Sequence, residues 1–348
     1  MKKDPLSISI KDIARAANVS HSTVSRALRN SSLVNSETAE KIKRIAHESH
    51  FRVSAVGRSL ATGRTNSIGV VVTTIADPFV AEVVTSVEDT ANARRYSVIL
   101  ASSKSDPERE MKVVQSFEER RVDGIVVVGS RVGSVYIPML AEMKIPIVLI
   151  NSQHPGEFVY SVSIDDAAGG QAATRFLIQL GHRRIGYIGD RMGAKSTTTR
   201  LAGYRQALEK AALPFRSELV VEEESNPEGG MRGADHLLSL AEPPTAIFCY
   251  NDLTALGALN AVHQRRLRVP DDISIIGFDD VAIASHMFPP LTTVRQPKLE
   301  LGRMATEILL NLLSGSKSET SRSIQGDLIV RDSTAPPPAH SMTLQRSG

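Results

Sequence analysis

The sequence predicts a chain of two parts, an all-α head and a larger α/β body built on two doubly wound parallel sheets. Residues 9–48 contain three short segments whose apolar residues recur at helical spacing. From residue 66 onward, ten short β-rich runs alternate with segments long enough for crossover helices. Repeated β-α units of this kind form parallel sheets with right-handed crossovers.

The head, residues 1–54, begins with two predicted helices that are joined by a tight turn. Ser9 and Asp12 have the spacing of a capping box at the first helix. Asn18 interrupts the helical pattern, and Ser20 can cap the second helix by accepting a hydrogen bond from a free backbone N–H. The apolar residues expected to face inward are Ile10, Ile13, Ala14, Ala17, Val24, Ala27 and Leu28.

The outer face of the second helix carries hydrogen-bonding side chains and no large apolar residue. Its residues are His21, Ser22, Ser25, Arg26 and Arg29. A helix-turn-helix lays such a face in the major groove of DNA, with its N-terminal residues nearest the bases. The alternative is an ordinary two-helix hairpin with a solvated outer face.

Two neighbouring features favour DNA binding over the plain hairpin. A third amphipathic helix follows, with Asn35 as its predicted cap, and together the three helices can bury a small core. Residues 1–65 also hold 12 Lys/Arg against 5 Asp/Glu, a net charge of +7, whereas the remainder carries −4. A basic head on an acidic body is the electrostatic pattern of a module that binds phosphates.

Residues 55–65 form a linker in which the run 55–61 predicts one or two helical turns. So short a helix is marginal in water by itself, and Gly57 costs it about 1 kcal/mol relative to alanine. With this linker, the first 63 residues resemble the head and hinge of the lactose-repressor (LacI/GalR) family of bacterial transcription regulators.

The resemblance implies a hinge helix that folds when a dimer meets its operator. A leucine from each hinge then wedges into the minor groove, and the matching residue here is Leu60. Val53 and Gly57 stand where the family usually has proline and alanine, which predicts a hinge that is costlier to order and DNA binding that depends more on dimerisation.

By the same match, His21, Ser22 and Arg26 are the main base readers. Arg26 suits a guanine, because its guanidinium offers two donors to O6 and N7. The full set of residues expected at DNA is Ser9, Ser20, His21, Ser22, Ser25, Arg26, Arg29, Asn30, Ser54, Val56 and Leu60.

The predicted strands of the body are nearly continuous apolar runs, as in sheets that are covered by helices on both faces. They span residues 67–72, 96–102, 123–129, 146–151, 162–165, 184–190, 219–223, 246–251, 273–280 and 292–297. The predicted crossover helices span residues 79–94, 107–120, 168–180, 199–212, 228–239, 252–266 and 298–313.

The body also resembles the lactose-repressor family, so that the similarity runs from about residue 7 to residue 333. It implies the fold of periplasmic sugar-binding proteins, in which two lobes enclose a ligand cleft. The matching motifs are ADPFVAE (76–82), GHRRIGYIG (181–189), RLAGY (200–204), NDLTALGAL (251–259), VPDDISIIGFDD (269–280) and PLTTVRQP (290–297).

The effector-binding and dimerisation region is expected to span residues 66–333. Its N-lobe is predicted at about 66–164 and 296–325, and its C-lobe at about 165–293 and 326–333. The proline-rich tail, 334–348, is predicted to be disordered.

Open α/β sheets bind ligands at the carboxyl ends of their strands, where this body has several polar residues. Carboxylate and amide oxygens accept from sugar hydroxyls, Arg and Asn donate, and a ring can cover a sugar face. For each Asp or Asn the alternative is a helix cap, which is the better interpretation of Asp252 and Asp280. The resemblance assigns Arg200, Asn251 and Asp279 to the effector first, and then Phe79, Asn151, Asp165 and Ser196.

Other classes of function find little support. No apolar run approaches the ~18 residues of a membrane span, and the N-terminus lacks the apolar region of a secretory signal. The lone Cys249 excludes an intrachain disulfide and fits a reducing cytoplasm. The loop 189–200 fails the spacing of a phosphate loop, and the histidines show no metal-type cluster, so neither cofactor, metal nor enzyme activity is expected.

Together with these patterns, the resemblance implies a cytoplasmic, nucleoid-associated homodimer that represses a carbohydrate-utilisation operon. Its partners would be a near-palindromic operator of double-stranded DNA and a small-molecule effector, a sugar or sugar derivative, with no membrane involved. The main alternative is a periplasmic-type solute-binding protein, which shares the body fold but needs a signal peptide and has no use for residues 1–63. A dehydrogenase or kinase would need a dinucleotide or phosphate loop at a strand–helix turn, which is missing here.

Overall fold

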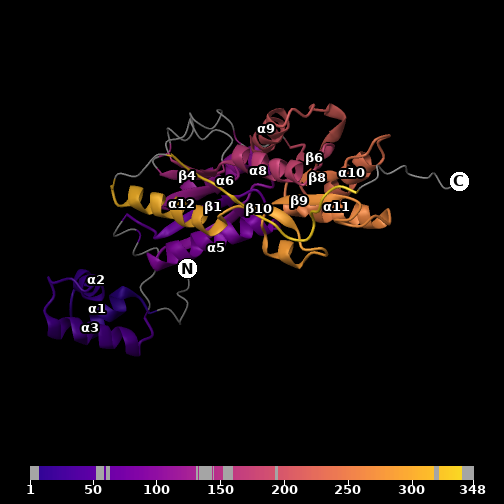
Figure 1. The fold of residues 1–348 in the computed structure, drawn as a ribbon. Coiled ribbons are helices and arrows are strands. Elements are labelled where there is room, and N and C mark those ends of the chain that lie inside the picture. Colours follow the sequence, from indigo (N-terminus) through magenta and orange to yellow (C-terminus); the bar gives the residue numbers. More distant parts are fainter. Residues whose placement is uncertain are drawn as a thin grey trace. The chain divides into compact units, whose positions relative to one another are not determined.

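The computed structural model divides the chain into two compact units, Met1–Thr65 and Asn66–Gly348 (Figure 1). It describes residues 8–51, 59, 63–130, 132, 143, 145–151, 160–192, 195–316 and 321–338.

The first unit consists of three helices around a small apolar core. They are α1 (Ile10–Ala17), α2 (His21–Leu28) and α3 (Ser36–Glu48). Asn18 ends α1 in the left-handed conformation, at φ 57°, and the Val19 side chain packs against the core. The buried core residues are Ile13, Ala14, Ala17, Val24, Ala27, Ile42 and Ala46, which confirms the predicted inner faces.

The second unit contains two six-stranded sheets, as the β-α alternation predicts. The first has the order β11-β5-β4-β3-β1-β2, and all of its pairings are parallel. Its strands are β1 (Ser67–Val72), β2 (Ser97–Ser102), β3 (Gly124–Val128), β4 (Ile147–Ile150), β5 (Ser161–Ile164) and β11 (Ser321–Ile324).

The second sheet has the order β12-β10-β9-β8-β6-β7 and is parallel except for the short edge strand β12. Its strands are β6 (Ile185–Asp190), β7 (Val220–Glu223), β8 (Ala246–Cys249), β9 (Ser274–Asp279), β10 (Thr292–Arg295) and β12 (Asp327–Ile329). We call the first sheet with its helices the N-lobe and the second the C-lobe.

Helices cover both faces of each sheet. In the N-lobe, α5 (Pro78–Ala93) and α12 (Lys298–Leu313) share one apolar core with the strands, and α6 (Pro107–Glu119) packs in the other. In the C-lobe, α8 (Asp166–Gln179) and α9 (Lys195–Lys210) lie on one face and α10 (Pro227–Leu238) and α11 (Asp252–Gln264) on the other. Short 3₁₀ turns lie at Ser217–Leu219 and Ala282–His286.

The chain passes between the lobes three times, after β5, after β10 and between β11 and β12. The passages lie side by side. Asp165 N–H donates to the Ile324 carbonyl (2.9 Å), and a Cβ on Gly326 would lie 2.6 Å from the Arg295 carbonyl oxygen and 3.1 Å from Ile164. These crossings hold the two lobes together while leaving their strand ends facing a common cavity.

The sequence predicted ten of these strands to within two residues at each end but missed β11 and β12. Those two runs, SRSI and DLI, are too short and polar to stand out from a loop. The prediction for α9 was wrong at its start, because the helix begins at Lys195 rather than at residue 199. Lys195 and Ser196 therefore belong to a helix and not to a loop.

The tail also differs from its predicted disorder in the part that the structure describes, residues 334–338. Ala335 exchanges hydrogen bonds with Ser274 (both 3.0 Å), and its carbonyl accepts from Nε2 of the buried His182 (2.9 Å). Composition alone could not reveal these partners, because they come from distant strands and loops. Residues 339–348 lie outside the described residues.

No helix among the described residues combines the length and the apolar character that a membrane crossing requires.

The close packing of α10 against α11 in the C-lobe can be tested by substitution at their contact. A Cβ added at Gly257 would lie 1.8 Å from the Pro227 carbonyl oxygen, which no real side chain tolerates. We expect Gly257→Ala to lower the free energy of unfolding by about 2 kcal/mol or more, because the helices must separate. Urea denaturation of the full chain measures this, with Asn260→Ala, at an exposed position of the same helix, as the matched control. Equal stability of the two variants would contradict the close approach.

Candidate DNA-binding head and effector pocket

The outer face of α2 presents the residues that the sequence assigned to DNA. His21, Ser22, Arg26 and Arg29 are exposed, and Ser25 is half-buried. The opposite face buries Val24 and Ala27 in the core of the head. The helix is therefore fixed on one side by packing and leaves a polar side for a partner.

The turn between α1 and α2 is built by short-range hydrogen bonds. Ser20 caps α2 by accepting from Thr23 N–H (3.1 Å), and its hydroxyl also lies 2.7 Å from that of Ser22. At α1, the Asp12 carboxylate accepts from Ser9 N–H (3.0 Å) and from the Ser9 hydroxyl (2.6 Å). Asn30 follows α2 in the left-handed conformation, at φ 55°.

Ser9 and Ser20 thus act as helix-end residues, whatever else they contact. The remaining residues expected at DNA, Ser54, Val56 and Leu60, lie outside the described residues.

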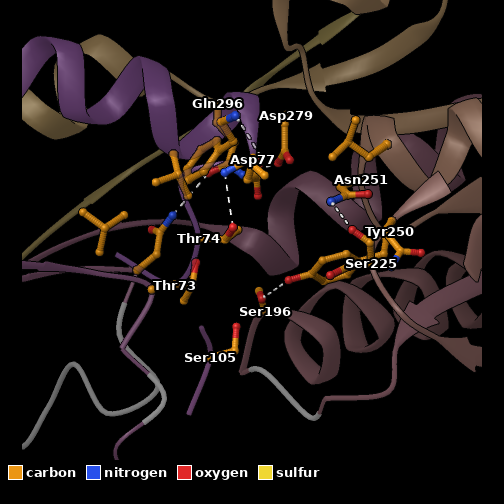
Figure 2. A pocket seen from close by; sticks show the side chains of 18 of the residues that line it. Thr73, Thr74, Asp77, Ser105, Ser196, Ser225, Tyr250, Asn251, Asp279 and Gln296 are labelled. Atoms are coloured by element: carbon orange, nitrogen blue, oxygen red, sulfur yellow. Dashed lines mark hydrogen bonds between the residues drawn. The ribbon is translucent and has the colours of Figure 1, made fainter. Parts of the chain in front are cut away.

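The body contains a cavity of about 350 Å³ between the carboxyl ends of the two sheets (Figure 2). Residues of both lobes line it. The N-lobe supplies Thr73, Thr74, Asp77, Phe79, Ser105 and Asn151, and the C-lobe supplies Lys195, Ser196, Arg200, Ser225, Tyr250, Asn251 and Asp279. Gln296, on the passage after β10, completes the polar lining.

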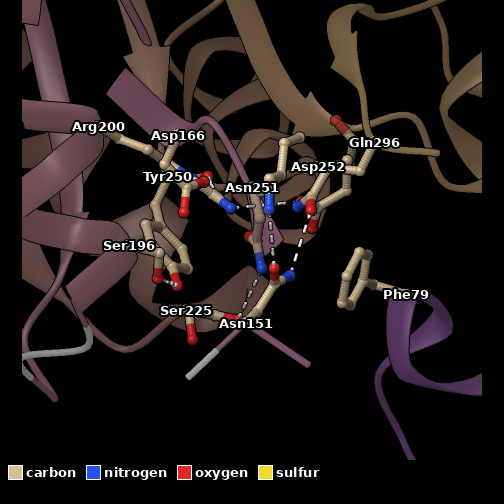
Figure 3. A network of polar contacts seen from close by, with 12 residues as sticks. Phe79, Asn151, Asp166, Ser196, Arg200, Ser225, Tyr250, Asn251, Asp252 and Gln296 are labelled. Carbon is tan, nitrogen blue, oxygen red and sulfur yellow. Dashed lines mark hydrogen bonds and ion pairs between the residues drawn. The ribbon is translucent and has the colours of Figure 1, made fainter. Parts of the chain in front are cut away.

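Arg200 is the charged centre of the C-lobe wall (Figure 3). Only 4% of the residue is exposed. Its guanidinium donates to Asp166 (2.8 Å) and to the Tyr250 carbonyl (2.6 Å), and it lies 3.7 Å from the centroid of the Phe278 ring. Although burial alone would lower the pKa of Arg200, Asp166 and the other acidic neighbours raise it. The side chain is therefore a permanent, fixed cation.

Asp279 lies beside this cation at the end of β9. Its carboxylate is 3.8 Å from the Arg200 guanidinium and accepts from Gln296 Nε2 (2.5 Å). Burial raises the pKa of Asp279, and Arg200 opposes that shift. The backbone is strained, because φ at Asp279 is 113°, in a region that residues other than glycine rarely adopt.

Two asparagines hold the walls in position and still reach the cavity. Asn251 caps α11, since its Oδ1 accepts from the N–H (2.8 Å) and the hydroxyl (2.7 Å) of Thr254. Asn151 accepts from Ile164 N–H (3.2 Å) and donates to Gln296 Oε1 (3.4 Å). Asn251 can be both a helix cap and a ligand contact, because its Oδ1 caps α11 while its amide nitrogen donates to the carbonyl of another lining residue, Ser225 (3.5 Å).

A model of the bacterial regulatory proteins of the lacI family matches residues 9–54, and one of a periplasmic binding protein-like domain matches residues 174–334. The HTH-type transcriptional repressor PurR of Haemophilus influenzae (strain PittEE) is 37% identical over 331 residues, which cover 93% of this chain and 98% of that protein. The chain belongs to the lacI family of bacterial regulatory proteins. It is therefore a DNA-binding repressor of the LacI type that responds to a ligand, and not an enzyme.

Further matches agree with this membership of the lacI family. The ribose operon repressor of Haemophilus influenzae (strain ATCC 51907 / DSM 11121 / KW20 / Rd) is 38% identical over 302 residues, covering 86% of this chain and 90% of that protein. A solved lac repressor dimer, bound to operator and the anti-inducer ONPF, has a TM-score of 0.87 at 26% identity, covering 94% of this chain and 99% of that one. The transcriptional regulator CelR–cellobiose complex has a TM-score of 0.72 at 30% identity, with the same coverage.

The cavity of this LacI-family chain gathers six of the seven residues that the sequence assigned to the effector: Phe79, Asn151, Ser196, Arg200, Asn251 and Asp279. Asp165 does not line it. Its side chain instead caps α8 by accepting from Ala168 N–H (2.9 Å). The next residue, Asp166, accepts the hydrogen bond from Arg200. Spacing in the sequence could not show which of the two adjacent aspartates makes this contact.

The helix-cap prediction for Asp252 and Asp280 was also wrong. Asp252 is fully buried and accepts from Val281 N–H (2.8 Å) and the Thr293 hydroxyl (2.5 Å). Asp280 pairs with Arg295 (2.7 Å) and Arg331 (2.6 Å). Both side chains connect the segment after β9 to β10, a role that depends on residues distant in the sequence.

Sequence reasoning missed Gln296 and Tyr250 as lining residues. Gln296 belongs to the motif PLTTVRQP, and Tyr250 follows the last residue of β8 directly, so position at a strand end was the available signal. The Tyr250 hydroxyl lies 2.7 Å from that of Ser196.

Asp252 predicts a pH dependence of stability. Burial raises its pKa from 3.8 to about 7, so between about pH 4 and pH 7 the folded chain binds a proton that the unfolded chain has released. The free energy of unfolding should therefore fall as pH rises through this window. We expect Asp252→Asn to flatten that fall in thermal melts, although the variant loses one hydrogen bond.

The matched control is Asp272→Asn, because Arg268 holds the pKa of Asp272 below its usual value. That carboxylate titrates below the window, so the control should keep the wild-type slope between pH 5 and pH 7. Parallel slopes in all three proteins would contradict the raised pKa of Asp252.

Proposed function

We propose that the chain represses transcription as a homodimer on a near-palindromic operator and that a small sugar bound in the cavity controls it. One observation carries the proposal: polar groups from both lobes converge on a single cavity, with Arg200 and Asp279 on one wall and Asn151 and Phe79 on the other. A ligand that bridges such walls favours one setting of the lobes over another, which is the requirement for ligand control.

The chemistry of the lining favours a sugar. Asp279 offers an acceptor to hydroxyl groups, and the guanidinium of Arg200 and the amide of Asn251 offer donors. Phe79 provides one apolar ring, which suits the C–H face of a monosaccharide. A volume of about 350 Å³ also accommodates a molecule of this size.

A flat nucleobase is the competing class of effector. Stacking such a base from both sides requires two free ring faces. The Arg200 guanidinium lies 4.6 Å from the centroid of the Tyr250 ring, and the Tyr250 hydroxyl contacts Ser196. Phe79 is therefore the ring that is better placed to stack on a base. On the rim, Ser225 contributes a short polar side chain. These features favour hydroxyl recognition over stacking.

Ligand binding is tested by thermal shift of the full chain with D-ribose, D-glucose, D-glucose 6-phosphate and guanine. D-Ribose comes first because one relative is named a ribose operon repressor. We expect a sugar to raise the melting temperature and Asp279→Asn to remove most of that rise, because the amide replaces an acceptor by a donor.

Asp271→Asn is the control, since Asp271 is exposed and outside the cavity lining. It should keep the wild-type shift. A rise with guanine alone would overturn the sugar class, and an unchanged rise in Asp279→Asn would overturn the assigned contact.

Operator reading is tested by selecting binding sites from random duplex DNA. We expect wild type to select a near-palindrome and to bind it as two chains, measured by sedimentation. Arg26→Ala should lose about 10- to 100-fold in discrimination at one position of each half-site, since a bidentate contact to guanine contributes roughly 1–3 kcal/mol.

Arg44→Ala removes the same charge from an exposed position of α3 and serves as the control. It should weaken binding to all sequences alike, with the preference kept. An Arg26→Ala protein with the full wild-type preference would contradict the assigned role, and a monomer bound at a single asymmetric site would contradict the dimer.

A further inference from the structure

Lys298 is a buried ammonium at the junction of the two lobes. It is the first residue of α12, directly after the passage from β10, and only 5% of it is exposed. Its Nζ donates to the carbonyls of Asp279 (2.8 Å) and Asp280 (2.6 Å) at the end of β9. Its ion-pair partner is Glu82 of α5, at 3.4 Å. One side chain thus joins a C-lobe turn to an N-lobe helix.

The C-lobe end of this connection is the turn that carries an effector contact. Asp279 and Asp280 both adopt positive φ, 113° and 52°. In this conformation both carbonyl oxygens accept from the Lys298 ammonium. The Asp279 carboxylate meanwhile lines the cavity, whereas Lys298 does not. A ligand that pulls on the carboxylate acts on the same short stretch of backbone that Lys298 holds.

The N-lobe end of the connection is equally restricted. Ser86 of α5 donates from its hydroxyl to the Leu299 carbonyl of α12 (2.5 Å). A Cβ on Gly302 of α12 would lie 2.6 Å from the Val83 carbonyl oxygen of α5. The two helices are packed too closely to slide independently, so they act as one body.

The same helix α5 also reaches the cavity. Phe79, in its first turn, lines the effector cavity, and Glu82 follows three residues later. Asp77, which caps α5, lines the cavity too. Helix α5 therefore borders the proposed effector site at Phe79 and contacts the Lys298 ammonium through Glu82.

We propose that Lys298 is the positioning residue that couples the Asp279 turn of the effector site to the α5–α12 pair of the N-lobe. The ammonium satisfies two carbonyls of one lobe and a carboxylate of the other, so the turn and the helix pair cannot change their relative setting while all three contacts persist. Binding at Asp279 is transmitted to α5 along this route. The proposal rests in part on the proposed function, because it takes Asp279 as an effector contact.

A purely structural lysine is the alternative. Removing it would loosen its immediate surroundings without affecting regulation. The distinguishing variants are Lys298→Met, which keeps most of the side-chain volume but removes the charge, and Glu82→Gln, which keeps the shape of the partner. Arg303→Met is the matched control, since Arg303 lies on the same helix and makes exposed ion pairs with Glu300 and Glu307.

The first experiment needs no ligand. Hydrogen exchange of the full chain, read by mass spectrometry, should show at least tenfold faster exchange in Lys298→Met at two separate places, residues 279–281 and the first half of α5. Glu82→Gln should reproduce the acceleration in α5. Arg303→Met should change α12 at most. If Lys298→Met alters only one of the two places, the connection between the lobes is absent and the proposal fails.

The second experiment measures regulation, as the ratio of selected-operator affinities without and with saturating D-ribose. In Lys298→Met and Glu82→Gln we expect ribose affinity within about threefold of wild type, because the effector site remains intact. The affinity ratio should fall most of the way to 1, because binding at Asp279 no longer affects α5. A wild-type ratio in both variants overturns the proposal. If wild type itself ignores D-ribose, the effector class proposed above is wrong, and the same ratio, measured with whichever compound raises the melting temperature of the full chain, then decides the role of Lys298.

Discussion

The fold of the body depends on stabilising one guanidinium that is buried away from water. Arg200 is almost completely buried, lies over the Phe278 ring and donates to Asp166 and to the Tyr250 carbonyl. A buried charge is tolerated only when it is paired and fully hydrogen-bonded. The surrounding strands and helices therefore have to meet at this point, and the cavity between the two lobes lies beside it.

Next to this cation, the segment after β9 is held by partners from both lobes. Asp279 presents its carboxylate to the cavity and its carbonyl to Lys298, while Asp280 holds Arg295 and Arg331. Backbone strain at two successive residues persists because so many partners fix the turn. In the proposed mechanism this strained turn belongs both to the effector site and to the lobe junction, so a change at one acts on the other.

The head follows a different principle, because short-range contacts determine it. Capping by Ser20 and Asn35, the left-handed Asn18 and the apolar spacing of α1 to α3 are all local in sequence. For that reason its helices and its outer face could be predicted closely. The strands of the body were equally clear, since buried parallel strands have continuous apolar runs. By contrast, β11 and β12 are short and partly polar, and only pairing with distant strands makes them strands.

Six of the residues that line the cavity were assigned from the family resemblance. The sequence by itself determined the three helices of the head, the alternation of the body and the concentration of basic charge in residues 1–65. These properties are periodic or local, so they survive in one dimension. Tertiary structure alone decided that Asp166 rather than Asp165 pairs with Arg200, that Asp252 and Asp280 hold neighbouring segments instead of capping helices, and that Lys298 reaches both lobes. Each of those roles depends on which groups of distant segments meet in the interior, where burial makes an unpaired polar group too costly to keep.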